Sequence, residues 1–275
     1  MPTTRKYIFD IDTKRYLNRV NSYRLLNGLD KITNADAVDI DNFIIGLKDL
    51  GVWHNTLFWL MRSQYNVGAG SNVLSFGGTS SNYDGTIATG ASWGSSGISF
   101  DPLISTAAVN YPISVIEIIR NDHSCVSIIN KHGQDNFTIF ECRAGPVTAY
   151  YTAFTSNDNT VSQLFVTATT RNGIVNYISN RGGTVPTGFT FVGVNIARNS
   201  QSTYKNGTLI VTDSNLNTRN PVGVVDTCRS GNGNIRAGTG IIPFVVLFNT
   251  PLSTSQHSSL YRLAKETLAK DLNIP

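Results

Sequence analysis

The sequence has few charged residues: Asp, Glu, Lys and Arg make up 15% of its 275 residues, against roughly 25% in an average protein. Of its 18 acidic residues only three are glutamates, Glu117, Glu141 and Glu266, so an active site built on two glutamates has few candidates. The net charge is +4, and no run of Lys and Arg is longer than Arg5-Lys6. Nucleic-acid-binding proteins concentrate such charge on one face, so we expect no nucleic-acid partner.

Cysteine is also scarce. The three cysteines, Cys125, Cys142 and Cys228, are an odd number and too few for a disulfide framework. Apolar neighbours such as Val126 and Phe140 place them in strands. We therefore predict three buried free thiols.

Long apolar stretches are absent as well. No stretch reaches the roughly 18 apolar residues of a membrane span. The first ten residues, MPTTRKYIFD, lack the apolar core of a signal peptide. We expect a protein that folds in a cytoplasm and does not insert into a membrane. The sequons at Asn136 and Asn206 would then carry no glycan.

The first fifty residues have the pattern of helices. One helix is predicted from a cap at Asp12 or Thr13 to about Asn27, with Gly28 in the usual position after the last turn. A second begins at a capping pair and ends at Gly51. The capping pair is Thr33 with Asp36, and the apolar stripe of helical period is Ile40, Phe43, Ile44 and Leu47.

From Thr56 onward the apolar residues alternate as in strands. The turns between the runs are rich in Gly, Asn and Ser, and Asn206-Gly207 is typical of a two-residue hairpin. Many short strands without helices between them predict an antiparallel sandwich or barrel. The predicted strands are Ile113 to Ile119, Phe137 to Cys142, Gln163 to Thr169, Phe189 to Ala197, Ser202 to Val211 and Pro243 to Asn249.

A third helix is predicted at the end of the sequence. Ser253 and Gln256 form a capping box. The apolar stripe that follows must be buried, most simply against the sandwich. It consists of Leu260, Leu263, Ala264 and Leu268.

Five segments resemble concanavalin A-like, laminin-G-like jelly rolls. Residues 204–210, YKNGTLI, resemble that family's "Y-x-N/D-G-x-x-V" hairpin, and residues 240–253, GIIPFVVLFNTPLS, resemble its closing strand before a final helix. Asn66 to Gly70, Tyr83 to Ile87 and Trp93 to Phe100 are similar to its first strands. The resemblance implies a mostly β fold, an antiparallel jelly-roll sandwich over residues 53–275.

The N-terminal part resembles a narrower group. Phe9 to Asp12, Tyr16 to Val20 and Ile40 to Trp53 are similar to segments that precede such jelly rolls in tailed-phage proteins, namely fibre and capsid-decoration proteins. The resemblance implies a bacteriophage virion protein, with residues 1–52 as an attachment segment. Other virion proteins, in the head or the tail, would be its partners.

The same fold occurs in glycoside hydrolases. Those that retain the configuration of the sugar's anomeric carbon hold two glutamate carboxyl groups about 5 Å apart. The family's Glu-x-Asp-x-(x)-Glu strand is missing, so Glu117 and Glu141 on separate strands are the remaining pair. Each glutamate could equally be the polar end of a strand, beside Arg120 or Arg143 respectively. We expect the chain not to be an enzyme and assign no catalytic residue.

Metal ligands form no clear set. The resemblance implies calcium in some family members, and residues 157–159 and 213–215 are rich in Asp and Asn, but both are also ordinary turn sequences. The four histidines have no zinc-ligand spacing. We expect no cofactor, with calcium as the alternative.

Exposed aromatic residues are the candidates for contact with glycans. Tyr150 and Tyr151 are adjacent, so a strand must point one of them outward, and Tyr83 lies in a Ser- and Asn-rich stretch. Most other aromatic residues are expected in the core. They are Trp53, Phe58, Trp59, Trp93 and Phe100.

Two compatible functions follow. The first is a virion structural protein whose N-terminal arm, with Tyr7, Ile8 and Phe9, adds a strand to a partner or wedges between subunits. Residues 1–30 could then be deleted without unfolding the sandwich. The second is a module that binds host-surface glycans, which would gain affinity from several copies in a homo-oligomer such as a trimer.

Overall fold

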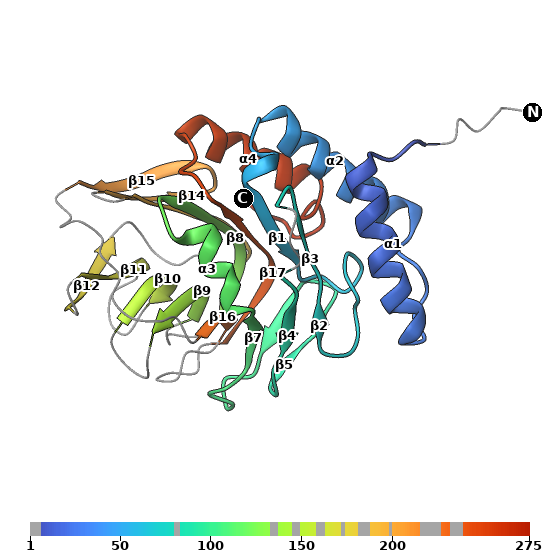
Figure 1. The fold of residues 1–275 in the computed structure, drawn as a ribbon, viewed down its shortest axis with the longest axis horizontal. Coiled ribbons are helices and arrows are strands. Elements are labelled where there is room, and N and C mark those ends of the chain that lie inside the picture. Colours follow the sequence, from blue (N-terminus) through green and yellow to red (C-terminus); the bar gives the residue numbers. More distant parts are fainter. Residues whose placement is uncertain are drawn as a thin grey trace, which may run out of the picture.

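The computed structural model describes residues 7–79, 83–132, 137–144, 149–157, 163–171, 174–180, 188–197, 200–214, 227–231 and 239–275. Two antiparallel sheets face each other as a β-sandwich, and helices cover the outer side of one of them (Figure 1). The predicted class, a β-sandwich with an N-terminal helical segment and a C-terminal helix, is confirmed.

The first sheet lies under the helices. Its strands are β1 Thr56–Leu60, β3 Ser75–Gly77, β5 Ala91–Ser92, β6 Ile98–Phe100, β8 His123–His132, β13 Thr190–Ile196, β14 Gln201–Lys205, β15 Thr208–Asp213 and β17 Thr239–Phe248. They are ordered β15-β14-β13-β8-β17-β1-β3, while β6 pairs with β17 and β5 with β6. In the part of the chain that the structure describes, β3 is therefore an edge strand.

The second sheet closes the sandwich on the other side. Its strands are β2 Asn72–Val73, β4 Gly85–Ile87, β7 Ala108–Tyr111, β9 Phe137–Ala144, β10 Ala149–Asn157, β11 Gln163–Arg171, β12 Ile174–Asn180 and β16 Thr227–Gly231. Their order is β12-β11-β10-β9-β16-β7-β4-β2.

The three long helices, α1, α2 and α4, begin where a capping side chain accepts a hydrogen bond from an N–H of the first turn. The elements are α1 Ile11–Leu26, α2 Asn34–Asp49, η1 Trp53–Asn55, η2 Ile113–Val115, α3 Ile116–Ile119 and α4 Thr254–Glu266. Thr33 accepts a hydrogen bond from the Asp36 N–H, and Ser253 forms the full capping box with Gln256. Both predicted caps are confirmed.

The predicted cap of α1 is wrong by two residues. Asp10, not Asp12 or Thr13, is the N-cap, because its side chain accepts from the Asp12 N–H. Asp12 lies inside the first turn. Gly28, at φ +71°, follows the C-cap as predicted.

The central strands of the first sheet are buried on both faces. In β1, Leu57 and Trp59 belong to the core between the two sheets, while Phe58 and Leu60 belong to a second core under the helices. α1, α2 and α4 each supply apolar side chains to this second core. At roughly 1.5–3 kcal/mol for each large apolar side chain buried, the helical layer contributes substantially to stability.

The predicted hairpin is confirmed and one predicted strand is wrong. Asn206 and Gly207 have φ of 47° and 73° between β14 and β15, as a two-residue turn requires. Residues 113–119 form η2 and α3 instead of a strand. A short apolar run is too short for its period to distinguish a helix from a strand. Here Val115, Ile118 and Ile119 are buried, at the spacing of a helix.

Two of the three cysteines form a disulfide, so the prediction of three free thiols is wrong for them. Cys142 in β9 and Cys228 in β16 lie opposite each other in the register and are bonded. Cys125 is a buried free thiol, as predicted. The two cysteines are 86 residues apart, and they meet because β9 and β16 are neighbours in the sheet. The sequence alone does not reveal that strand order.

The predicted boundary between an attachment segment, residues 1–52, and a sandwich, residues 53–275, does not separate two cores. Tyr16, Leu17 and Val20 of α1 are buried in the same core as Phe58 and Val246 of the first sheet. Deletion of residues 1–30 would expose that side of the core, contrary to the expectation that the sandwich folds without them. Within the described residues, no helix is long and apolar enough to cross a membrane.

Candidate functional site

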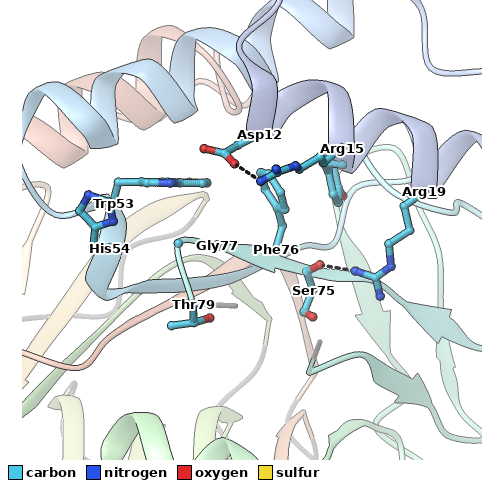
Figure 2. A pocket seen from close by; sticks show the side chains of 11 residues that line it. Asp12, Arg15, Arg19, Trp53, His54, Ser75, Phe76, Gly77 and Thr79 are labelled. Atoms are coloured by element: carbon cyan, nitrogen blue, oxygen red, sulfur yellow. Dashed lines mark hydrogen bonds and ion pairs between the residues drawn. The ribbon is translucent and has the colours of Figure 1, made fainter. Parts of the chain in front are cut away.

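A cavity of about 410 Å³ lies between the first half of α1 and the edge strand β3. We call it the α1 pocket. Figure 2 shows Asp12, Arg15 and Trp53 over the backbone of Gly77. Its lining residues come from three separate segments of the sequence: Asp12, Arg15, Tyr16, Arg19, Trp53, His54, Ser75, Phe76, Gly77, Gly78 and Thr79.

The floor of the α1 pocket depends on two glycines. A Cβ on Gly77 would overlap with the carbonyl oxygen of Thr56, and one on Gly78 with the carbonyl oxygen of Trp53. Both obstacles are backbone atoms of β1 and η1 and cannot rotate away. Only glycine therefore lets β3 approach so closely, and the floor is left without side chains.

The apolar wall of the pocket consists of aromatic rings. Trp53 and Phe76 have ring centroids 5.4 Å apart, and Phe76 stacks on Tyr16 at 4.8 Å. The Tyr16 hydroxyl donates to the Tyr65 carbonyl oxygen at 2.8 Å, and burial raises the pKa of Tyr16, so the phenol stays neutral. These contacts fix the rings before any ligand arrives.

One face of α1 supplies the charged rim, because Asp12, Arg15 and Arg19 follow one another at helical spacings of three and four. Lys48 binds both Asp10 and Asp12 at 2.7 Å. Partial burial opposes protonation of Lys48, but these hydrogen bonds outweigh it and raise its pKa. The Asp12 carboxylate is thus held in place from α2.

Arg19 closes the free edge of β3 beside the pocket. Its guanidinium donates to the Ser75 carbonyl oxygen at 3.0 Å and pairs with Asp84. Asp84 in turn accepts from the Ser75 N–H at 2.8 Å. Side chains therefore take the hydrogen bonds that an added strand would otherwise make at Ser75.

The predicted glycan-contact residues do not lie together in the described structure. Tyr83 is only 5% exposed, in the core between the sheets, so the expectation that its ring faces solvent is wrong. Its carbonyl oxygen accepts from the Trp59 indole, which explains why this loop turns inward. Tyr150 and Tyr151 lie on β10, whose side chains are outside the described part of the structure.

The predicted attachment residues precede α1. Tyr7 and Ile8 are exposed, and the Tyr7 hydroxyl donates to Asp41 on α2 at 2.9 Å. Phe9 packs at the border of the second core. This end of the arm rests on α2.

The two glutamates considered for catalysis lie in different surroundings. Glu117 is exposed on α3, and Glu141 is buried on β9 in an ion pair with Arg229 of β16 at 2.6 Å. Glu141 thus has a partner on the neighbouring strand, and the side chain of Arg143 lies outside the described residues. Cross-strand pairing places unlike charges opposite each other, which the sequence order does not reveal.

The described residues contain no group of three or more His, Cys, Asp or Glu side chains placed to hold a metal ion. The two calcium candidates, residues 157–159 and 213–215, lie partly outside the described residues.

Sequence reasoning missed the α1 pocket. The spacing of Asp12, Arg15 and Arg19 and the pair Gly77-Gly78 were visible signals. Neither signal reveals that α1 packs beside β3, which depends on the second core.

No protein-family model and no curated protein matches the sequence. Solved structures do resemble the fold. Trypanosoma rangeli sialidase has a TM-score of 0.57 at 12% identity, over 86% of this chain and 40% of that chain. The same sialidase in complex with sialic acid has a TM-score of 0.56 at 12% identity, over 94% and 39%. The receptor-binding domain of botulinum neurotoxin type G has a TM-score of 0.53 at 11% identity, over 75% and 50%.

At these identities the likeness shows the fold alone. The chain spans half or less of the length of each of these three structures. The prediction that the chain is not an enzyme is contradicted, because sialidases are among the structures with a similar fold. The predicted β-sandwich fold agrees with these neighbours.

Proposed function

We propose that the chain is a glycan-binding module and that the α1 pocket holds part of the glycan. The observation that carries the proposal is the composition of the pocket: Trp53 and Phe76 form an aromatic wall beside the Asp12, Arg15 and His54 side chains. Sugar rings present C–H groups to aromatic faces and hydroxyls to polar groups. A volume of about 410 Å³ is within the usual range of small-ligand sites.

The neighbours support this class of ligand. One sialidase structure is a complex with sialic acid, and one toxin domain is named for receptor binding. Both are statements about those proteins, and they make a carbohydrate the first ligand to test on a sandwich of this kind.

A glycan array incubated with the full chain tests the proposal. We expect at least one glycan to be retained, and we expect His54→Ala to weaken its binding. His132→Ala is the matched control, because His132 is also exposed but lies at the far end of β8. An array without any bound glycan would end the proposal, and equal binding by the two variants would move the site away from the α1 pocket.

We also propose that the N-terminal helical layer attaches the chain to a larger particle, as in a phage capsid-decoration or short-fibre protein. Six of the nine exposed large apolar side chains of the described residues lie between residues 7 and 45. They are Tyr7, Ile8, Ile11, Leu25, Leu26 and Ile45. Apolar side chains gathered on one layer favour a contact with another protein.

Mass spectrometry of purified virions tests the attachment. The chain should be present, having folded in the host cytoplasm, and Ile8→Ser with Ile11→Ser should remove it from the particle. Leu103→Ser is the control, since Leu103 is 91% exposed but lies outside the helical layer. Absence of the unaltered chain from every particle would contradict this proposal. Several copies on one particle would strengthen weak glycan binding by avidity.

A further inference from the structure

The carboxylate of Asp12 and the carbonyl oxygen of Ser75 at the α1 pocket already accept hydrogen bonds from the protein. Asp12 accepts from Lys48 at 2.7 Å. Asp84, which lies behind Arg19, accepts from the Ser75 N–H and hydroxyl at 2.8 and 3.1 Å and pairs with Arg19. The Ser75 carbonyl oxygen also binds Arg19. Each oxygen of Asp12 therefore already has a donor from the protein, Arg15 on one and Lys48 on the other.

Several donors, in contrast, remain. Arg15 is 73% exposed, and its single ion-pair contact among the described residues is with Asp12 at 3.4 Å. A guanidinium has five N–H donors, so most of those on Arg15 face solvent. The Trp53 indole N–H has no acceptor among the described residues, whereas those of Trp59 and Trp93 bind carbonyl oxygens at 2.7 and 3.1 Å.

Thr79 adds a further polar group to the pocket lining. Its hydroxyl oxygen is buried and has no hydrogen-bond partner in the described structure. A buried hydroxyl without a partner is unfavourable, and a group that enters the pocket can provide the missing bond.

A surplus of donors selects an acceptor-rich ligand. A sugar hydroxyl donates as well as accepts, and the Asp12 carboxylate and the Ser75 carbonyl oxygen already accept from Lys48 and Arg19. A carboxylate or a sulfate accepts only, and its charge strengthens each bond to a guanidinium. We propose that the α1 pocket binds glycans through an anionic group, a carboxylate or a sulfate, seated on Arg15; this rests on the proposed glycan-binding function.

The position of Arg15 fits this role better than that of Arg19. Arg19 is fixed against β3 by Ser75 and Asp84, while Arg15 projects from α1 over the pocket (Figure 2). Its contact with Asp12 is long and exposed, so most of its guanidinium donors stay available to an anion. The ring that carries the anion would then lie against Trp53 and Phe76.

Matched glycan pairs test the inference. Each pair shares one backbone: a glucuronate-containing disaccharide and its glucose counterpart, and a 6-sulfated disaccharide and its unsulfated counterpart. We expect the acidic member to bind roughly tenfold more tightly, the difference that one charge-assisted hydrogen bond supports. Preference confined to one pair would identify the anion as carboxylate or sulfate.

Arg15→Gln should remove the preference for the acidic member and leave the unfolding midpoint unchanged. Arg262→Gln, an exposed arginine on α4, is the matched control and should keep the preference. Equal binding of acidic and neutral members, or a preference that survives Arg15→Gln, overturns the inference and leaves the glycan-binding proposal standing. If the array and all four disaccharides show no binding, both proposals fail.

Discussion

At the scale of single residues, His257 is the buried titratable group with the simplest surroundings. It lies on α4 against the first sheet, with its ring stacked on Tyr204 at 3.7 Å and its Nε2 2.8 Å from Asn195 Oδ1. Its Nδ1 has no partner among the described residues. Burial lowers the pKa of His257 to about 3. A proton on this ring would leave a charge in the second core.

We predict that the free energy of unfolding falls as the pH falls from about 6.5 to about 3. In that range the unfolded chain binds a proton at His257 and the folded chain does not, so acid favours unfolding. The contribution of neutral His257 to the free energy of unfolding is fully present above pH 6.5. Below that pH it decreases by up to about 1.4 kcal/mol per pH unit. Urea unfolding at a series of pH values measures this slope.

His257→Gln isolates the contribution of this residue, because glutamine can still donate to Asn195 but does not titrate. Carboxylates contribute equally to the pH dependence of both proteins, so the difference between their slopes belongs to His257. Identical slopes between pH 6.5 and pH 4 would show that the ring is protonated in the folded state.

Residue-scale features were predictable where the partner is close in sequence. The Thr33 cap, the Ser253–Gln256 box and the Asn206-Gly207 turn each depend on residues no more than three positions apart. The glycan-contact role of Tyr83 was predicted from its polar neighbours alone. Its burial depends on Trp59, 24 residues earlier, which no local pattern reveals.

At the scale of elements, α2 allows a direct comparison of its two faces. Ile44 is fully buried in the second core, while its neighbour Ile45 is 37% exposed. We predict that Ile44→Ala lowers the free energy of unfolding by about 2–5 kcal/mol through lost burial and the cavity it leaves. Ile45→Ala should change it by less than about 1 kcal/mol. Chemical denaturation of both variants measures the difference.

The same substitution at adjacent positions removes differences in helix propensity from the comparison. Equal destabilisation by the two variants would contradict the packing of α2 on the first sheet. Loss of particle attachment in Ile45→Ala without loss of stability would separate the exposed face from the core.

Whether an element is a helix or a strand was predictable where its apolar pattern extended over enough residues to show a period. α2 has four apolar positions at helical spacing and was identified correctly, whereas the seven residues of η2 and α3 were too few to define a period. The α1 pocket was beyond reach for another reason. It requires α1 to lie beside β3, and that packing depends on apolar contacts distributed over three helices and the first sheet.

At the scale of the whole molecule, the helical layer and the two sheets form continuous cores. α1, α2 and α4 share apolar contacts with β1, β8 and β17, so the helical layer stabilises the sandwich. Under the proposed attachment through this layer, a deletion there would disturb folding together with attachment. Surface substitutions such as Ile8→Ser test attachment more cleanly than a deletion does.

The disulfide between β9 and β16 bears on where the protein matures. Reducing compartments keep cysteines as thiols, so a chain folded in a cytoplasm would form the bond only after release from the cell. Thiol counts before and after release test the expectation of cytoplasmic folding.

We predict that the Cys142–Cys228 bond raises the free energy of unfolding by roughly 4 kcal/mol, because it closes a loop of 86 residues in the unfolded chain. Denaturant unfolding of the oxidised protein and of a Cys142→Ala, Cys228→Ala double variant measures the difference. Thiol titration of the unreduced, denatured protein should find one thiol, Cys125, and Cys125→Ala should find none. Three thiols after exposure to an oxidant would contradict the pairing of these two strands, and with it the strand order at the centre of the second sheet.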